Sequence, residues 1–177
     1  MPDLRAIEIA STRLCLRSFK AEDAAESFAE ATPTLTRFMA WDPSPSLAAF
    51  AEIWRGWLPK MAAGTDLALT IRLQPTGEFM GMAGLLCIGQ PEPEIGIWIK
   101  EAAHGAGFGR EAVAAVVAWH SRETGAAGFT YPVVIENWRS RSLAESLGGR
   151  LVDTRELRKP SGVVLDEVVY LIPAVRA

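Results

Sequence analysis

The chain has 177 residues, of which 49% are hydrophobic and 22% are charged, and its formal net charge is −3. This length and balance indicate one globular domain over residues 1–177 with enough apolar residues for a proper core. The sequence has no surplus of basic residues and no runs of Lys or Arg, which argues against a nucleic-acid-binding protein.

The cysteines, histidines and apolar runs narrow the class of protein further. Cys15 and Cys87 each lie in a strand-like apolar pattern and are predicted to be reduced core thiols. Only two histidines occur, so no metal site is predicted. The N-terminus resembles no secretory leader and no apolar run reaches membrane-spanning length, so we expect a cytoplasmic protein that does not bind membranes.

The first third of the chain begins with a strand and a short helix. Alternating apolar residues predict a strand over 13–17, and 21–31 has a helical pattern with acidic residues early. A Pro-punctuated loop follows and ends with Asp-Pro-Ser-Pro at 42–45. It is compatible with a loop that folds back on the core and equally with one wall of a ligand pocket. Its apolar residues are Leu35, Phe38, Met39 and Trp41.

A second helix is predicted to begin after Ser46, which is a suitable N-cap. Apolar residues recur along it at helical spacing, and Pro59 is expected to kink or end it near Trp57. An aromatic stripe of this kind usually belongs to the core. Trp54 and Trp57 are nevertheless candidates, with Phe38 and Trp41, for a binding surface.

The remaining elements alternate between strands and helices. The ranges 66–73 and 78–88 predict a hairpin, and a strand over 94–99 precedes a long apolar helix that ends at Gly125. A strand over 129–135, a short helix from Asn137 through Leu147 and a closing hairpin over 151–157 and 163–172 complete the chain. The order β, α, α, β, β, β, α, β, α, β, β predicts an α/β (α+β) fold, a mixed sheet with helices on both faces.

Three alternating glycines, Gly105, Gly107 and Gly109, separate the 94–99 strand from the long helix. A strand, a glycine turn and a helix start form an anion-binding arrangement, because the first helical N–H groups lack partners and glycine lets a ligand approach. A plain tight turn is the alternative. A Walker loop is excluded because Arg110 and Glu111 follow Gly109, and the dinucleotide-binding fingerprint fails on glycine spacing.

The remaining pattern, x-x-x-Gly-x-Gly at 104–109, resembles motif A of the GNAT superfamily of acyl-CoA-dependent N-acetyltransferases. Other segments, from about residue 7 to 172, are similar in order to the branch typified by ribosomal-protein N-terminal alanine and serine acetyltransferases. These segments are Thr12–Arg17 with Glu22–Ala24, Trp41–Pro43, Glu94–Ile99, Ala103–Ala112, and Asn137–Ser140 with Leu143 and Leu147–Gly148. Three residues depart from the branch pattern, namely Ile97, His104 and Gly149.

The resemblance implies a GNAT-like fold, with a mostly antiparallel sheet of about seven strands, about four helices and a splay between the fourth and fifth strands. It implies acetyl transfer from acetyl-CoA to a primary amine by direct attack in a ternary complex. The amine is a protein N-terminus or a small molecule, and a homodimer is one possible assembly.

The resemblance also implies where the cofactor binds. Backbone N–H groups of Gly105–Arg110 would hold the pyrophosphate, and Gly96 suits a break or bulge in the 94–99 strand beside the pantetheine, which would pair with 97–99. Arg110 is a second phosphate contact or a solvated side chain. The cofactor-binding candidates are Ile97, Trp98, Ile99, His104, Gly105, Ala106, Gly107, Phe108, Gly109, Arg110, Asn137 and Ser140.

Three residues are candidates for the chemistry. Glu94 is the candidate general base, directly or through water, unless it is only a solvated carboxylate. Ser140 is the candidate that stabilises the leaving sulfur, and its alternative is a local cap. Asn137 caps the short helix, hydrogen-bonds the pantetheine, or does both. Phe38, Trp41, Trp54 and Trp57 are candidates for the acceptor side.

Two other functions are compatible with the sequence. A catalytically silent acyl-CoA-binding or sensing module would keep motif A without a working base or acid. A structural dimerisation domain would retain the glycine turn without a ligand.

Overall fold

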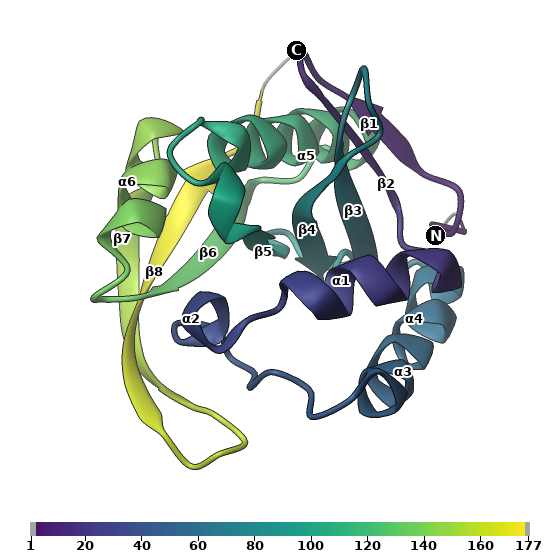
Figure 1. Ribbon diagram of the computed structural model, residues 1–177. Coiled ribbons are helices and arrows are strands. Elements are labelled where there is room, and N and C mark those ends of the chain that lie inside the picture. Colours follow the sequence, from purple (N-terminus) through teal and green to yellow (C-terminus); the bar gives the residue numbers. More distant parts are fainter. Residues whose placement is uncertain (1–2, 176–177) are drawn as a thin grey trace.

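The computed structural model of the protein describes residues 3–175, in which eight strands form one mixed sheet in the order β1-β2-β3-β4-β5-β6-β8-β7 (Figure 1). The strands are β1 (Glu8–Ala10), β2 (Leu14–Ser18), β3 (Leu67–Leu73), β4 (Phe79–Leu86), β5 (Glu94–Ile99), β6 (Gly128–Val134), β7 (Arg150–Arg158) and β8 (Val164–Pro173). The α-helices are α1 (Ala24–Glu30), α2 (Pro33–Thr36), α3 (Leu47–Arg55), α4 (Trp57–Ala63), α5 (Phe108–Thr124) and α6 (Trp138–Ser146). Two short 3₁₀ turns, η1 (Ala21–Asp23) and η2 (Glu101–Ala103), precede α1 and α5.

The predicted fold class and element order are confirmed, with two additions near the N-terminus. The short strand β1 pairs with β2 and makes the sheet one strand larger than predicted. The Pro-punctuated loop contains α2, where the Thr32 hydroxyl accepts a hydrogen bond from the Leu35 N–H and Pro33 takes the first helical position. Proline suits that position because its missing N–H would have no intrahelical partner.

The second predicted helix is divided into α3 and α4, and the division lies at Gly56 rather than at Pro59. Pro59 is the third residue of α4, where a backbone N–H has no partner inside the helix. Its ring therefore fits the first turn of α4, and the predicted interruption near Trp57 is confirmed.

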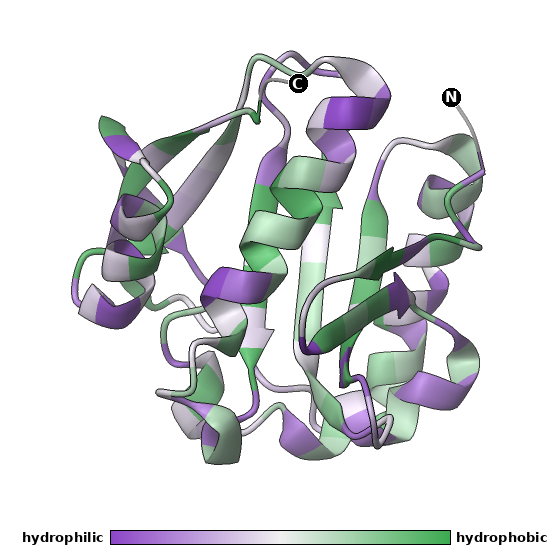
Figure 2. Cartoon of the chain, turned by 90° about the horizontal axis from the view of Figure 1, so that it is seen from above, coloured by the Kyte–Doolittle hydropathy of each residue, from purple (hydrophilic) through white to green (hydrophobic). Residues whose placement is uncertain are grey.

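Helices cover both faces of the sheet, with α5 and α6 on one side and α1, α3 and α4 on the other (Figure 1). The inner side of α5 buries Ala112, Val113, Val116 and Val117 in the main core. Figure 2 shows α5 lying across hydrophobic strands, as expected for a helix that packs directly on a sheet.

The sheet opens between β5 and β6, and this confirms the predicted splay. These parallel strands pair only at Glu94 and Thr130, whereas β5 pairs with β4 along its whole length, from Leu86 opposite Glu94 to Gly81 opposite Ile99. The edge of β5 after Glu94 is therefore unpaired on the β6 side.

The predicted break or bulge at Gly96 is wrong, because β5 runs regularly through Gly96, which pairs with Gly84. The irregularity lies one strand away, where the β3–β4 register shifts between Ile71 and Arg72. Beside that shift Gly81 has a φ of 152°, and a Cβ there would lie 2.1 Å from the Trp98 carbonyl oxygen. A side chain at Gly81 would therefore push β5 away.

The two cysteines are free, but they are not both core residues as predicted. Cys15 is partly buried in β2, while Cys87 is exposed after β4 with a φ of 56°. Within residues 3–175, no helix is long and apolar enough to cross a bilayer. The same residues contain no group of three or more His, Cys, Asp or Glu side chains placed to hold a metal ion.

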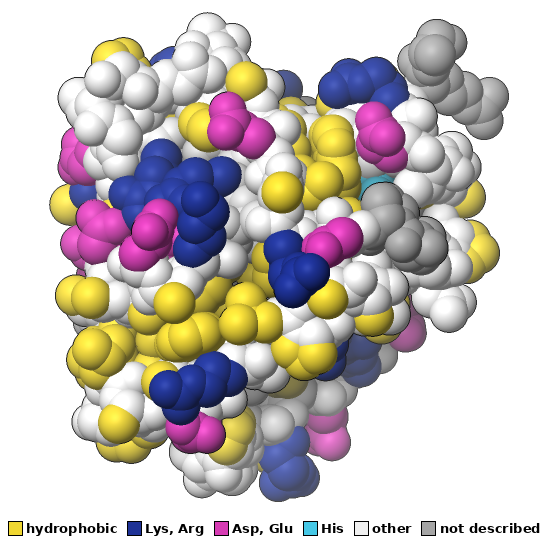
Figure 3. Space-filling view, turned by 90° about the vertical axis from the view of Figure 1, so that its right-hand side faces the viewer, with side chains coloured by type: hydrophobic (Ala, Val, Ile, Leu, Met, Phe, Trp, Pro, Cys, Tyr) yellow, Lys and Arg dark blue, Asp and Glu magenta, His cyan; other side chains and the backbone are white. Residues whose placement is uncertain are grey.

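A buried carboxylate joins the start of the helical layer to the sheet. Asp23 is fully buried and accepts hydrogen bonds from Arg17 at 2.6 Å and Arg72 at 2.7 Å. Its second oxygen accepts from the Lys20 N–H, so its charge is compensated. On the face shown in Figure 3, positive and negative side chains are intermixed around apolar patches.

Candidate active site

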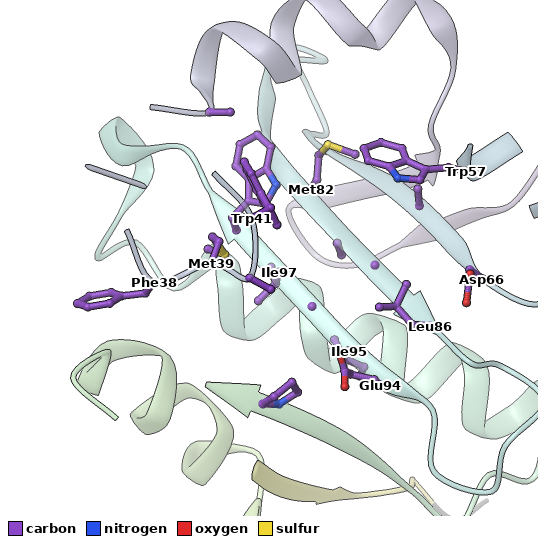
Figure 4. A pocket seen from close by; sticks show the side chains of 18 of the residues that line it. Phe38, Met39, Trp41, Trp57, Asp66, Met82, Leu86, Glu94, Ile95 and Ile97 are labelled. Atoms are coloured by element: carbon purple, nitrogen blue, oxygen red, sulfur yellow. The ribbon is translucent and has the colours of Figure 1, made fainter. Parts of the chain in front are cut away.

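A pocket of about 540 Å³ lies at the opening between β5 and β6 (Figure 4). Its lining includes Glu94, Gly96 and Trp98 on β5, and Tyr131 and Pro132 on β6. It also includes residues of α6 on one face of the sheet and of α3 and α4 on the other. Because β5 and β6 separate after Glu94, one cavity can extend from one face of the sheet to the other.

The apolar loop between α2 and α3 forms a wall of this pocket, while Leu35 is buried and does not line it. Phe38, Met39 and Trp41 all line the cavity (Figure 4). Trp57 also lines it, whereas Trp54 is not among the lining residues and packs against Phe19 at a ring-centroid distance of 5.8 Å. Three of the four predicted acceptor-side aromatic residues therefore surround the pocket.

One buried lysine holds both ends of this wall. The Lys159 ammonium donates to the Thr36 carbonyl at 3.0 Å and pairs with the Asp42 carboxylate at 3.1 Å, and its side chain is 6% exposed. Asp42 also accepts hydrogen bonds from the backbone N–H and hydroxyl of Ser161. The β7–β8 hairpin thus fastens the 36–42 segment, and hydrogen bonds to both partners balance the burial of the ammonium.

Glu94 belongs to a charged cluster at the pocket. The Arg155 guanidinium lies 3.5 Å from Glu94 and donates to Glu167 at 2.9 Å. The side chain of Glu167 is 7% exposed and that of Glu94 is 33% exposed. Glu94 is therefore a pocket carboxylate with one long ion pair, accessible to water and close to the point where the strands part.

Ser140 and Asn137 both line the α6 side of the pocket. The Asn137 Oδ1 accepts from the Ser140 N–H at 3.3 Å and caps α6, while the described residues provide no acceptor for its Nδ2. The Ser140 hydroxyl lies 2.8 Å from the Tyr131 hydroxyl. Both polar groups of α6 therefore keep hydrogen-bonding capacity toward the cavity.

The glycine turn leaves a row of backbone donors free at the start of α5. Gly105 and Gly107 have φ angles of 82° and 80°, which favour glycine because a Cβ would be strained there. Within residues 3–175, the N–H groups from Gly105 to Arg110 have no protein acceptor, and the ladder of α5 begins with Glu111 donating to Gly107. This geometry suits an anion.

The side chains in this segment contact the protein. His104 Nε2 lies 2.7 Å from the Ile99 carbonyl oxygen, and Arg110 donates to Ser146 at 3.1 Å. The guanidinium of Arg13 lies over the Phe108 ring, 4.4 Å from the ring centroid. The predicted anion contacts of this segment are therefore available from the backbone rather than from these side chains.

Arg13, a residue that the sequence did not single out, braces the glycine turn. Its Nη1 donates to the Ala106 carbonyl at 3.0 Å and its Nε to Glu111 at 2.7 Å. Glu111 also accepts from the Ser11 hydroxyl and the Arg13 N–H, and these bonds keep its pKa below the ordinary value although partial burial opposes the shift. The brace neutralises a carboxylate that would otherwise repel an anion at the helix start.

Four further residues of the site have no motif in the sequence that marks them, namely Tyr131, Lys159, Arg155 and Glu167. All four lie on β6 or in the C-terminal hairpin, in stretches interpreted only as strands or a turn. Their roles depend on partners remote in sequence, as for Lys159 and Thr36, which are 123 positions apart. The sequence of β8 does carry one indication of a site, because the charged residue Glu167 stands at the start of an otherwise apolar run.

Comparisons with known proteins agree with this geometry. The family model described as acetyltransferase (GNAT) domain matches residues 13–150, well over half of the chain. The chain therefore belongs to the GNAT acetyltransferase family. No curated protein matches it significantly.

Solved structures share the fold at low sequence identity. Mycobacterium smegmatis RimJ in complex with CoA-disulfide has a TM-score of 0.84 and 19% identity, over 98% of this chain and 90% of that one. RimL, a ribosomal L7/L12 alpha-N-protein acetyltransferase in complex with coenzyme A, has a TM-score of 0.82 and 18% identity, over 95% of this chain and 98% of that one. A GCN5-related N-acetyltransferase from Brucella melitensis has a TM-score of 0.78 and 19% identity, over 97% and 80%.

Proposed function

We propose that this chain, as one catalytic unit, transfers the acetyl group of acetyl-CoA to a primary amine. The observation that carries this proposal is the continuity of the pocket through the splayed sheet. Helix α6, which lines one side of the pocket, is joined to the start of α5 by the hydrogen bond from Arg110 to Ser146, and the other side of the pocket is enclosed by the aromatic wall. An acyl donor and an amine can meet in it from opposite faces.

The residues fit acetyl-CoA. The unpaired N–H groups from Gly105 to Arg110 are suited to the pyrophosphate, and the unpaired edge of β5 after Glu94 is suited to the amide groups of pantetheine. Acetyl-CoA supplies an activated acyl carbon bonded to a thiolate leaving group. RimL and RimJ were each solved with coenzyme A, which supports the same ligand here.

The acceptor enters as an ammonium ion and must lose a proton before it can attack. Glu94 is suited to accept that proton, directly or through water, because its carboxylate lines the pocket and is partly exposed. The amine nitrogen then attacks the acyl carbon, the new C–N bond forms and the C–S bond breaks. The nitrogen loses its second proton, the sulfur gains one, and one proton is released overall.

Ser140 is suited to donate the proton to the departing sulfur. Its hydroxyl lies at the pocket and is hydrogen-bonded to Tyr131, which can hold it in place and replace its proton. The free Asn137 Nδ2 is suited to an acceptor group of the pantetheine, while Oδ1 keeps its capping bond. Cap and ligand contact are thus compatible in one residue.

The test is mass spectrometry of amines and peptides incubated with acetyl-CoA and the protein. We expect a mass gain of one acetyl group, which requires both substrates. Glu94→Gln should lower kcat/KM and change the basic limb of its pH profile, and a wild-type profile would refute the assignment of Glu94 as base.

A catalytically silent acyl-CoA sensor is the second candidate, because the backbone N–H groups of the glycine turn and the unpaired edge of β5 can bind the cofactor without a working base or acid. Acetyl-CoA would then raise the melting temperature while no amine is acetylated. A ribosomal-protein N-terminus, the acceptor that the name of RimL gives for that enzyme, is one acceptor within the proposal.

A further inference from the structure

The charges that line the acceptor side of the pocket do not cancel. Five charged side chains line it, namely Lys60, Asp66, Glu94, Arg155 and Glu167. Lys60 and Asp66 form a pair at 3.1 Å and neutralise each other. Arg155 is then the one cation beside two carboxylates, so the pocket retains a single negative charge.

That charge is concentrated on Glu94. Arg155 makes a hydrogen-bonded pair with Glu167 at 2.9 Å, whereas its distance to Glu94 is 3.5 Å. Glu167 is the more deeply buried carboxylate and requires this partner more. Glu94 is therefore the carboxylate available to a ligand cation.

The rest of the acceptor side is apolar. Figure 4 shows Phe38, Met39, Trp41, Trp57, Met82 and Leu86 around the cavity, with the carboxylate of Glu94 in the same lining. A second positive charge on the ligand would be desolvated against these side chains. A ligand carboxylate would have no free cation, because Lys60 and Arg155 are already paired.

We propose that the acceptor is a monocationic primary amine joined to an apolar group, with its ammonium at Glu94 and its apolar group against the Phe38–Trp41 wall. This inference rests on the proposed acetyl transfer and specifies its substrate class. Polyamines and free amino acids are poor acceptors by the same reasoning. Two kinds of acceptor have this chemistry: a free amine, and the α-amine of a peptide with an apolar first residue.

Pairs of acceptors that differ by one charged group test the proposed preference for monocationic amines in steady-state acetylation assays. Phenylethylamine differs from phenylalanine by one carboxylate, and heptylamine differs from diaminoheptane by one amine. We expect the first member of each pair to have the higher kcat/KM by on the order of tenfold, the size of one partly screened charge interaction. An amidated peptide that begins with Phe, assayed beside phenylethylamine, identifies the source.

Substitutions in the cluster of Glu94, Arg155 and Glu167 should change the preference for a monoamine over a diamine. Arg155→Gln leaves two uncompensated carboxylates, so the preference for heptylamine over diaminoheptane should fall about tenfold. Arg158→Gln removes the same charge from the same strand, but Arg158 is exposed and does not line the pocket, so the preference should stay unchanged.

The double variant Arg155→Gln/Glu167→Gln guards against misfolding, because it removes the ion pair without leaving a buried, unpaired carboxylate at position 167. It leaves Glu94 as the one free charge and should restore the preference for heptylamine. The inference is overturned if wild type prefers the diamine or the amino acid, or if Arg155→Gln behaves like Arg158→Gln. If wild type binds acetyl-CoA and acetylates none of these amines, the proposed transfer itself fails.

Discussion

The hydroxyl groups of Tyr131 and Ser140 lie 2.8 Å apart, which joins a buried strand residue to the first turn of α6. Burial raises the pKa of Tyr131 to about 12, although the bond to Ser140 opposes the shift. Tyr131 therefore keeps its proton at every pH at which an amine acetylation is assayed. If Ser140 protonates the leaving sulfur, Tyr131 is the group that can hold and replenish its proton.

Removal of either hydroxyl should slow turnover more than it weakens cofactor binding. We expect Ser140→Ala to lower kcat about a hundredfold, at the lower end of general acid catalysis, and Tyr131→Phe to lower it about tenfold. Isothermal titration with acetyl-CoA should show little change in Kd for either variant. Unchanged turnover in Ser140→Ala would leave the sulfur without its proposed proton donor.

The lysine that fastens the pocket wall should affect the acceptor and not the cofactor. Lys159→Met removes the bonds to Thr36 and Asp42, so the wall loosens and the KM for the acceptor should rise about three- to tenfold, as for the loss of about 1 kcal/mol. The Kd for acetyl-CoA should not change, and Lys159→Arg, which keeps the charge, should recover part of the loss.

A second readout of this wall needs no acceptor. The fluorescence of Trp41 is obtained by subtracting the spectrum of a Trp41→Phe variant from that of the protein with Trp41. We expect acrylamide to quench this Trp41 fluorescence more strongly when Lys159 is replaced by Met. Arg158→Gln, at the neighbouring exposed position that ends β7, serves as the control. Equal quenching in all backgrounds would show that Lys159 does not hold the wall.

The brace behind the glycine turn should be needed for tight cofactor binding. Arg13→Gln breaks the bonds to Ala106 and Glu111 and leaves the Glu111 charge uncompensated near the helix start. We expect the Kd for acetyl-CoA to rise about fivefold, which corresponds to about 1 kcal/mol. Arg122→Gln removes the same charge from the exposed side of α5. An equal rise in the Kd for acetyl-CoA in that variant would indicate that only the loss of positive charge matters, and not the hydrogen bonds of Arg13.

The protein should lose stability in mild acid because of His120. This residue of α5 is 1% exposed, both its ring nitrogens lack partners within the described residues, and burial lowers its pKa below the ordinary 6.5, with Glu123 opposing the shift. The unfolded chain therefore takes up the proton first as the pH falls through about 6.5, and the folded state becomes less stable.

Replacement of His120 by Leu removes this titration. The decrease in Tm between about pH 7.5 and about pH 5.5 should be smaller in His120→Leu than in wild type. Differential scanning fluorimetry at matched ionic strength measures it. An identical slope in the two proteins would assign the acid sensitivity to other groups.

The sequence by itself determined the order of nearly all elements, the glycine turn and the family. These features are local: periods of two and of about 3.6 residues distinguish strands from helices, and glycines at 105 and 107 mark positive φ angles within a few residues. The errors were local as well. The predicted break at Gly96 is absent, because β5 pairs regularly with β4 through that residue.

Only the tertiary structure decided which side chains meet. Arg13 and Glu111 are 98 positions apart, Lys159 and Thr36 are 123 apart, and Arg155 contacts Glu94 across the opened sheet. No periodic pattern carries such pairings, because each depends on strand register and on where β5 parts from β6. The motif thus predicted an anion site, while the register and the splay determined the charge and the walls of the acceptor pocket.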